Sequence, residues 1–221
     1  MRVVLRMLEK QASDNVFKAV RKMILASGLP FEPARMNAHW PRFSYGPSVA
    51  VSQIALREYV DIYLRTFVSA EEVKSKLEAV CPDGLTILNV QRVPYALPSV
   101  QNLAAAATFS VEGNFEAFAL KQTIEDYFNA SRAEVVYQGK NGFAITKNIK
   151  PYLLGAKTIS PEKIQLTLAC VADKWIQPQE VLAGYLGISV PLDEAAWSVE
   201  GFTFIREGLY WRDSQGELHL I

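Results

Sequence analysis

Arginine and aromatic residues alternate over one stretch of the chain, between positions 35 and 57. Guanidinium groups bind phosphates and aromatic rings stack on unpaired bases, so this pattern is typical of a surface that binds single-stranded RNA. A half-buried strand whose arginines stay in solvent would give the same pattern, and the sequence leaves both interpretations open. The residues concerned are Arg35, Trp40, Arg42, Phe43, Tyr45 and Arg57.

The sequence offers few residues for metal binding, for a phosphate-binding loop or for nucleophilic catalysis. The two histidines, His39 and His219, lie far apart and have no metal-ligand spacing. No CxxxCxxC motif is present to hold an iron–sulfur cluster, and no glycine-rich phosphate loop occurs. Ser44 has only His39 nearby as a base, and residues 37–41 are expected to form an exposed loop. We therefore expect no catalytic residue, no cofactor and no metal.

Composition restricts the class of protein. The 221 residues suffice for one large domain or two small ones, and half of them are apolar. Lys plus Arg and Asp plus Glu both number 23, which argues against a protein that coats nucleic acid but permits a local basic patch. The first residues are too charged for a signal peptide, and no apolar run is long enough to span a membrane. Cys81 and Cys170 are expected to be free thiols, with a disulfide as the alternative. We expect a cytoplasmic protein.

The first half of the chain has the element order β-α-β-β-α-β, the split βαβ pattern of a ferredoxin-like fold. Asp14 is expected to cap a helix that ends at Gly28, where glycine suits a left-handed cap. Ser69 begins a second helix with a Ser-x-x-Glu capping box. Strands are expected at 2–8, 42–45, 59–64 and 85–93. The first helix is expected to bury Val16, Phe17, Val20, Met23 and Ile24.

The second half is expected to repeat this order. The predicted architecture is α+β, with two ferredoxin-like halves in tandem, residues 1–95 and 96–221, joined by a short proline-containing linker. A single continuous α+β sheet is the alternative. Strands 59–64 and 164–171 are expected at the centres of their sheets. The other elements predicted are strands at 104–111, 134–137 and 143–146, helices beginning at Asn114 and Gln177, and a final hairpin of 202–206 and 209–212.

Four short stretches of this sequence resemble a known bacterial family. They are Gly-Leu-Pro at 28–30, Pro-Arg-Phe-Ser-Tyr-Gly-Pro at 41–47, Glu-Tyr-Val-Asp-Ile-Tyr-Leu at 58–64 and Ile-Arg-Glu-Gly-Leu-Tyr at 205–210. In these stretches the chain is similar to the radical-SAM-linked proteins, which occur beside, or fused to, radical S-adenosylmethionine proteins. The resemblance implies a radical-SAM partner that carries the iron–sulfur cluster.

The chain also departs from the family pattern. Relatives carry a Ser-His-Leu-Asp run before the first helix, and Ser13 stands here where that histidine would fall. The family's Gly-aromatic-polar-Pro loop is replaced by residues 36–40, which keep neither the glycine nor the proline. The chain is therefore interpreted as a diverged member that keeps the fold.

The matching stretches suggest a second candidate binding site. Their polar groups lie on strands where core packing alone would favour aliphatic residues. Arg206 lies on the matching C-terminal stretch and can pair with Glu58 across the two halves, so an ion pair without a ligand is the alternative. The candidate residues are Arg42, Ser44, Tyr45, Glu58, Tyr59 and Arg206.

Two classes of function follow. The resemblance and the missing cluster ligands favour a non-catalytic accessory or substrate-presenting protein that acts with a radical-SAM partner on RNA or a translation component. The alternative is an RNA-binding or RNA-processing protein that acts alone through residues 35–57. A module that binds a small molecule between the halves is a third possibility.

Overall fold

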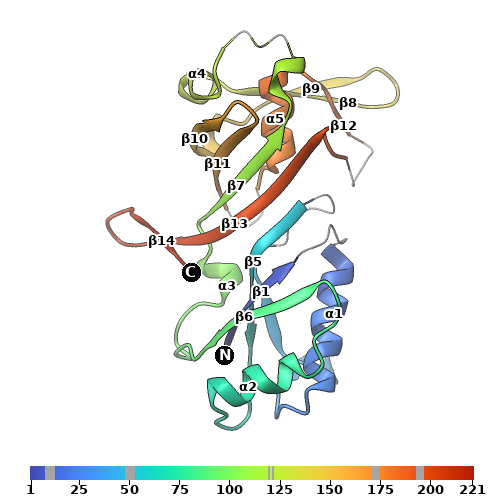
Figure 1. Ribbon diagram of the computed structural model, residues 1–221, viewed down its shortest axis with the longest axis vertical. Helices are drawn as coiled ribbons and strands as arrows, with labels where there is room; N and C mark the ends of the chain where they lie inside the picture. Colours follow the sequence, from blue (N-terminus) through green and yellow to red (C-terminus); the bar gives the residue numbers. More distant parts are fainter. Residues whose placement is uncertain (8–12, 48–52, 119, 121, 171–174, 193–196) are drawn as a thin grey trace. The chain divides into compact units, whose positions relative to one another are not determined.

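The computed structural model describes residues 1–7, 13–47, 53–118, 120, 122–170, 175–192 and 197–221, with only the backbone for 13–15. The chain divides into two compact units (Figure 1). Unit 1 is Met1–Ala104 with Ile221, and unit 2 is Ala105–Leu220. Both combine helices with an antiparallel sheet, so the fold is α+β. None of the described helices is long and apolar enough to cross a membrane.

Unit 1 has a sheet of four antiparallel strands in the order β4-β5-β1-β6. The inner position of β5, between β4 and β1, confirms a central strand here. This strand begins earlier than expected and ends at Ile62, two residues before the predicted end at Leu64. The strands are β1 (Arg2–Met7), β4 (Phe43–Tyr45), β5 (Gln53–Ile62) and β6 (Leu85–Gln91).

Two helices, α1 (Ser13–Ala26) and α2 (Ala70–Glu78), pack on one face of this sheet (Figure 1). Ser69 caps α2 as predicted, because its hydroxyl accepts a hydrogen bond from the Glu72 amide at 3.1 Å. The Glu72 carboxylate bonds Lys76 at 2.8 Å, so only the Ser69 half of the predicted capping box forms. The core between sheet and helices is aliphatic, and most of its side chains are almost fully buried. Its members include Val3, Leu5, Val20, Ile24, Val60, Ile62, Val73 and Leu77.

The segment before β4 is a hairpin, so the exposed loop expected at 37–41 is wrong. Strands β2 (Pro33–Ala34) and β3 (Asn37–Pro41) pair around a turn at Arg35. Backbone bonds fix this hairpin, because the Arg42 amide donates to the Glu32 carbonyl at 2.7 Å. The side chain of His39 on β3 is nevertheless exposed.

The segment 96–104, which the sequence assigned to the second half, belongs to unit 1. It contains a short helix, α3 (Val100–Leu103), whose first residue is fully buried. The Val100 amide donates to Oδ2 of Asp61 at 2.7 Å. A buried amide must find a partner, so this bond fastens the segment to β5.

Unit 2 has a main sheet in the order β10-β11-β7-β13, all antiparallel, with β14 paired to the far part of β13. The expected central strand is β11, where Ile164, Leu166 and Leu168 are buried while Gln165 and Thr167 are half-buried. Val171, at the end of that prediction, lies outside the described residues. The strands are β7 (Ala106–Gly113), β10 (Leu153–Ser160), β11 (Lys163–Ala169), β13 (Phe202–Arg212) and β14 (Leu218–Leu220).

The hairpin predicted in this half forms, but in a separate sheet. Strands β8 (Glu134–Gln138) and β9 (Ala144–Asn148) join β12 (Val190–Pro191) in a three-stranded sheet. In the main sheet, β10 (Leu153–Ser160) pairs with β11. The sequence predicted a strand of the 134–146 hairpin at this position and did not predict β10. Most of β10 is exposed or half-buried, so its sequence shows no apolar alternation.

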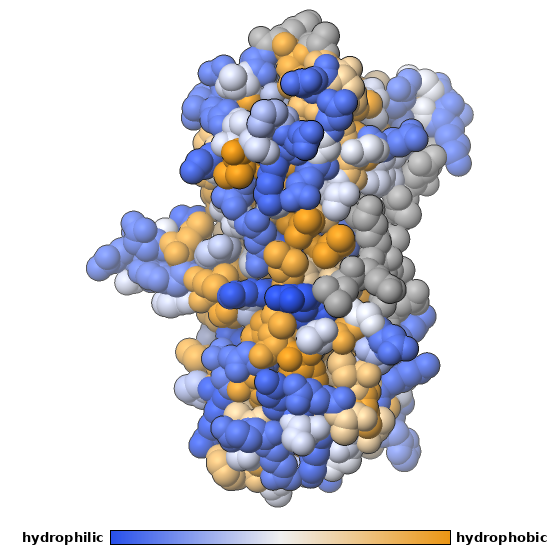
Figure 2. Space-filling model, in the orientation of Figure 1, coloured by the Kyte–Doolittle hydropathy of each residue, from blue (hydrophilic) through white to orange (hydrophobic). Residues whose placement is uncertain are grey.

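The hairpin expected at 202–212 is wrong, because β13 runs through this region as one strand. A register shift between Arg206 and Gly208 accommodates Glu207-Gly208 as a bulge against β7. The chain turns later, between β13 and β14, and Figure 2 shows the hydrophilic tip of that hairpin at the left.

The helices of unit 2 are short. The helix expected from Asn114 begins instead at Ile124, because Thr123 and Asp126 form a capping box there. The helix expected from Gln177 begins there, with a second capping box between Gln177 and Glu180. It ends at Gly187, which has a left-handed conformation. The helices are α4 (Ile124–Asn129) and α5 (Pro178–Leu186), with 3-10 turns η1 (Phe115–Ala117) and η2 (Lys150–Tyr152).

Replacing Gly28 by valine tests the end of α1. Gly28 has φ of 65°, and a β-carbon built there meets no atom within 4 Å, so only the backbone conformation opposes a side chain. We expect Gly28→Val to lower the free energy of unfolding by about 1–2 kcal/mol, and Gly28→Asn to cost less, because asparagine tolerates this region. Urea unfolding followed by circular dichroism measures both variants. Equal stabilities of the wild type and both variants would contradict the assignment.

Candidate functional site

A groove of about 230 Å³ lies on unit 1, where α1 meets the β2–β3 hairpin and the beginning of β4. Helix α1 contributes two side chains one turn apart, the hairpin contributes its turn and part of β3, and β4 contributes its first residues. We call this the basic-aromatic groove. Its principal lining residues are Phe17, Arg21, Arg35, Trp40, Arg42 and Phe43.

Trp40 is the most accessible aromatic ring of the groove, with 44% of its surface exposed. The Arg21 guanidinium lies over its ring, 4.2 Å from the centroid, and this cation–π contact holds the indole in place. The rings of Phe17 and Phe43 pack beside it with centroids 4.8 Å apart. The groove therefore offers a fixed aromatic surface next to positive charge.

Arg42 is held by three side chains. Its Nη1 donates to Oε2 of Glu32 at 2.7 Å and to the Tyr95 hydroxyl at 3.1 Å. Its guanidinium carbon also lies 4.1 Å from the centroid of the Tyr63 ring. The hydrogen bonds with Tyr95 and then Glu32 raise the pKa of Arg42 above its usual value. The guanidinium is thus charged and oriented before any ligand arrives.

The basic surface continues along α1 beyond the groove. Lys18 and Lys22 are both exposed. Lys18 lies three residues before Arg21, and Lys22 directly follows it. The sequence from 16 to 26 contains no acidic residue to offset them. Both lysines line a separate hollow with Val80 and Pro82, so their charge lies on another side of α1 from the groove.

The structure gathers three of the four residues predicted for RNA contact. Arg35, Trp40 and Arg42 line the groove together. Arg57 is exposed on β5 and does not line it. The sequence missed the contribution of α1, because Phe17 was expected in the core, whereas 42% of its surface is exposed. Phe17 lies at the edge of the apolar face of α1, one turn before Arg21. This position could have indicated from the sequence that Phe17 is partly exposed beside a basic residue.

In unit 1 the second predicted site lies on and beside the paired strands β4 and β5. Ser44 pairs in register with Asp61, and the ring of Tyr45 lies 6.5 Å from that of Phe17. Glu58 and Tyr59 are both buried, and as neighbours on β5 they face opposite sides of the sheet. Arg42 alone of this group lines the groove.

The remaining member of that group, Arg206, is buried on β13 of unit 2. Its predicted pairing with Glu58 joins the two units and stays a prediction.

The thiol and imidazole groups do not form a reactive centre. Burial raises the pKa of Cys170 to about 12 and that of Cys81 above its usual value, so neither thiol is activated. The imidazole of His219 bonds Asp213 at 2.8 Å and lowers the pKa of that carboxyl, far from the groove in sequence. Among the described residues, no three His, Cys, Asp or Glu side chains are placed to hold a metal ion. The groove brings arginine and aromatic side chains together without such a centre.

A buried ion pair lies behind the residues that hold Arg42. Nε and Nη2 of Arg2 donate to the two carboxylate oxygens of Asp61 at 2.8 and 3.0 Å, and both residues are buried. Asp61 also accepts the Val100 amide bond described above. This carboxylate therefore connects β1, β5 and the segment that carries Tyr95.

Substituting Asp61 tests how much this pair contributes. We expect Asp61→Asn to lower the free energy of unfolding by about 3–5 kcal/mol, because it leaves the Arg2 guanidinium buried without a counter-charge. The matched control is Glu78→Gln, which removes one carboxylate from the exposed Lys74–Glu78 pair and should cost about 0.5 kcal/mol or less. Chemical denaturation measures both. Similar costs for the two variants would show that the buried pair is not a structural support.

The chain belongs to a bacterial family. Residues 31–178, more than half of the chain, match the model of the family described as "Uncharacterized protein conserved in bacteria (DUF2344)". A comparison with curated proteins finds no match. The matched range includes Arg35, Trp40 and Arg42, while Phe17 and Arg21 precede it. The association with radical-SAM proteins is not part of this match and stays a prediction.

Proposed function

We propose that this member of the DUF2344 family binds single-stranded RNA through the basic-aromatic groove. The observation that carries the proposal is the Arg21 guanidinium stacked on Trp40 beside Arg35 and Arg42. Exposed aromatic rings stack on bases of any identity, and arginines bind the phosphates between them. The groove combines both kinds of contact within a volume of about 230 Å³, enough for a base and its flanking phosphate.

The distribution of charge supports this ligand. The chain has no net charge, so any affinity for a polyanion must come from a local cluster. Such a cluster lines the groove, because Arg21 and Arg35 have no carboxylate partner among the described residues. The Glu32 carboxylate bonds to Arg42 and offsets only that guanidinium. The remaining charge faces solvent.

We also infer that both units are ferredoxin-like. In unit 1 the order β1-α1-β4-β5-α2-β6 gives the sheet order β4-β5-β1-β6, and in unit 2 the order β7-α4-β10-β11-α5-β13 gives β10-β11-β7-β13. These orders correspond strand by strand. Each unit also inserts a hairpin, β2–β3 or β8–β9, between its first helix and the next strand of its main sheet. Internal duplication accounts for this match, although the fold alone assigns no function.

The accessory role that the resemblance implies is a further proposal. A protein that holds single-stranded RNA can present it to a partner that carries the iron–sulfur cluster. Co-purification of the chain with a cluster-bearing radical-SAM protein tests this role. Its absence would leave RNA binding as an activity of the chain by itself.

Replacing Trp40 tests the stacking contact. We expect Trp40→Ala to weaken binding of a fluorescently labelled oligouridine of about 12 nucleotides at least about fivefold, because one base loses its stacking partner. Fluorescence anisotropy measures the dissociation constant. The control Phe143→Ala removes an aromatic side chain that is 64% exposed in unit 2 and should leave binding unchanged. Equal affinities of the wild type and Trp40→Ala would exclude the groove.

The arginines provide a second test through the salt dependence. We expect Arg35→Gln to weaken binding and to reduce the slope of log affinity against log salt by about 0.7, the value for one phosphate contact on a single strand. Arg57→Gln removes an equally charged, exposed side chain of the same unit outside the groove, and its slope should equal that of the wild type. Identical slopes for the two variants would contradict the placement of phosphates at the groove.

A further inference from the structure

Unit 1 has a second hollow that the proposed function does not use. It has a volume of about 330 Å³ and lies between the residues that follow β5 and those that follow β6. This volume is at the small end of the range, about 300–1,000 Å³, that is typical of small-molecule sites. We call it the arginine pocket. The side chains used below are Glu32, Asp61, Arg65, Phe67, Arg92 and Tyr95.

The pocket carries surplus positive charge. The two carboxylates in its lining are each paired, Asp61 with Arg2 and Glu32 with Arg42. Arg65 and Arg92 are exposed, and neither has a carboxylate partner among the residues that the structure describes. These two guanidinium groups are therefore available to an anion, and arginine binds phosphate with strong charge-assisted hydrogen bonds.

Aromatic rings stand at the rim of the pocket. Phe67 and Tyr95 have 76% and 74% of their surfaces exposed, which is unusual for such large side chains. The Arg92 guanidinium lies over the Phe67 ring at 5.3 Å from its centroid. The Tyr95 ring meets Tyr63 edge to face, with centroids 6.2 Å apart. A ligand with a planar ring can thus stack at the rim while its anion reaches the arginines.

Backbone hydrogen bonds hold the segments that carry these side chains. The Arg65 amide donates to the Pro30 carbonyl at 2.8 Å, beside the bridge between Phe31 and Leu64. Tyr95 lies in a turn closed by the bond from the Leu97 amide to the Pro94 carbonyl at 3.1 Å. The pocket walls are therefore largely formed before binding.

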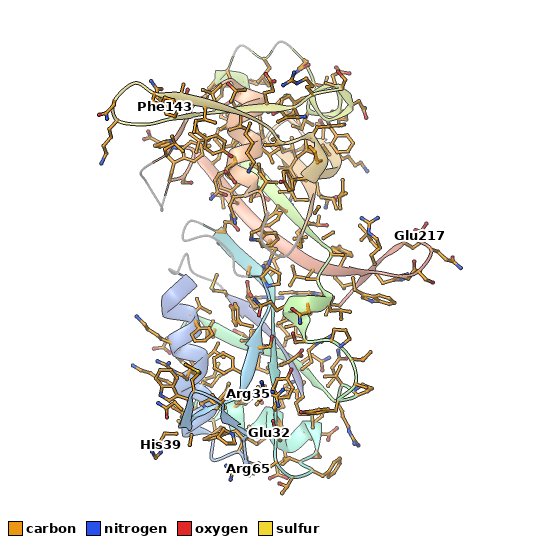
Figure 3. The ribbon with its side chains drawn as sticks, turned by 180° about the vertical axis from the view of Figure 1, so that it is seen from behind. Glu32, Arg35, His39, Arg65, Phe143 and Glu217 are labelled. Carbon is orange, nitrogen blue, oxygen red and sulfur yellow. The ribbon has the colours of Figure 1, made fainter. Side chains whose placement is uncertain are left out.

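The pocket and the basic-aromatic groove meet at one side chain. Arg42 lines the groove, and its guanidinium bonds to Glu32 and Tyr95, which line the pocket. Figure 3 shows Arg35, Glu32 and Arg65 at the same end of unit 1. A strand lying in the groove can therefore place its last nucleotide at the pocket.

We propose that the arginine pocket binds a nucleoside monophosphate, with Arg65 and Arg92 on the phosphate and the base stacked at the rim on Phe67. The nucleotide can be free or can be the phosphorylated end of an RNA strand. Binding of the free nucleotide is independent of the groove, whereas binding of a strand end rests on the proposed function.

Titration calorimetry with AMP and with UMP tests the pocket directly. The wild type should bind at least one of them, and adenosine, uridine and inorganic phosphate should each bind at least about tenfold more weakly than the nucleotide, because each lacks one of the two contacts. The double variant Arg65→Gln/Arg92→Gln should lose at least about tenfold in affinity. Phe67→Ala should weaken the nucleotide but not inorganic phosphate. All three substituted side chains are exposed, so an unchanged melting temperature confirms that these variants fold.

The control Phe143→Ala removes an exposed ring of unit 2 outside both sites and should leave AMP and UMP binding as in the wild type. Failure of both nucleotides to bind the wild type, equal binding by the double variant, or inorganic phosphate as tight as the nucleotide would overturn the proposal. AMP or UMP binding without oligouridine binding would support the pocket and remove the groove.

Oligouridine with and without a terminal phosphate then distinguishes the two sources. If the ligand is a strand end, the phosphorylated oligonucleotide binds more tightly, and this advantage disappears in Arg65→Gln/Arg92→Gln. If the ligand is a free nucleotide, both oligonucleotides bind alike while AMP or UMP still binds. Either result supports a nucleoside monophosphate site.

Discussion

The arrangement of unit 1 depends on the buried ion pair between Arg2 and Asp61. Two charges removed from water are tolerable only when they are paired and their remaining hydrogen-bonding capacity is used. Asp61 meets this condition with two bonds from Arg2 and one from the Val100 amide. The same bonds hold β1 on β5 and anchor the segment after Tyr95. The geometry around Arg42 therefore rests on a contact inside the unit.

This arrangement concentrates basic side chains in a chain with no net charge. The carboxylates of Asp61 and Glu32 are each bound to an arginine, which leaves Arg21, Arg35, Arg65 and Arg92 with no ion pair among the described residues. Aromatic rings lie against the guanidinium groups of Arg21 and Arg92. Such cation–π contacts orient an arginine without neutralising it. This combination of charge and aromatic rings is the basis on which we propose RNA and nucleotide ligands for unit 1.

The sequence predicted features that depend on residues close together in the chain, such as helix caps and turns. Ser69 caps α2, and Gly28 adopts a left-handed conformation. Features set by tertiary contacts were missed. Strand β10 lacks apolar alternation because most of it faces solvent, and the bulge at Glu207-Gly208 looked like a turn. Arg35, Trp40 and Arg42 were found from their spacing, but Arg21 reaches the groove only through the packing of α1 against β3.

Ultraviolet cross-linking of oligouridine to the full chain, with the adducts located by mass spectrometry, tests the central claim most directly. The account predicts adducts on the peptides that contain Trp40 and Phe43, because their rings lie in the groove. These adducts should be lost at high salt, since phosphate contacts hold the strand there. Adducts confined to unit 2, such as the exposed Phe143 beside β9, would contradict it.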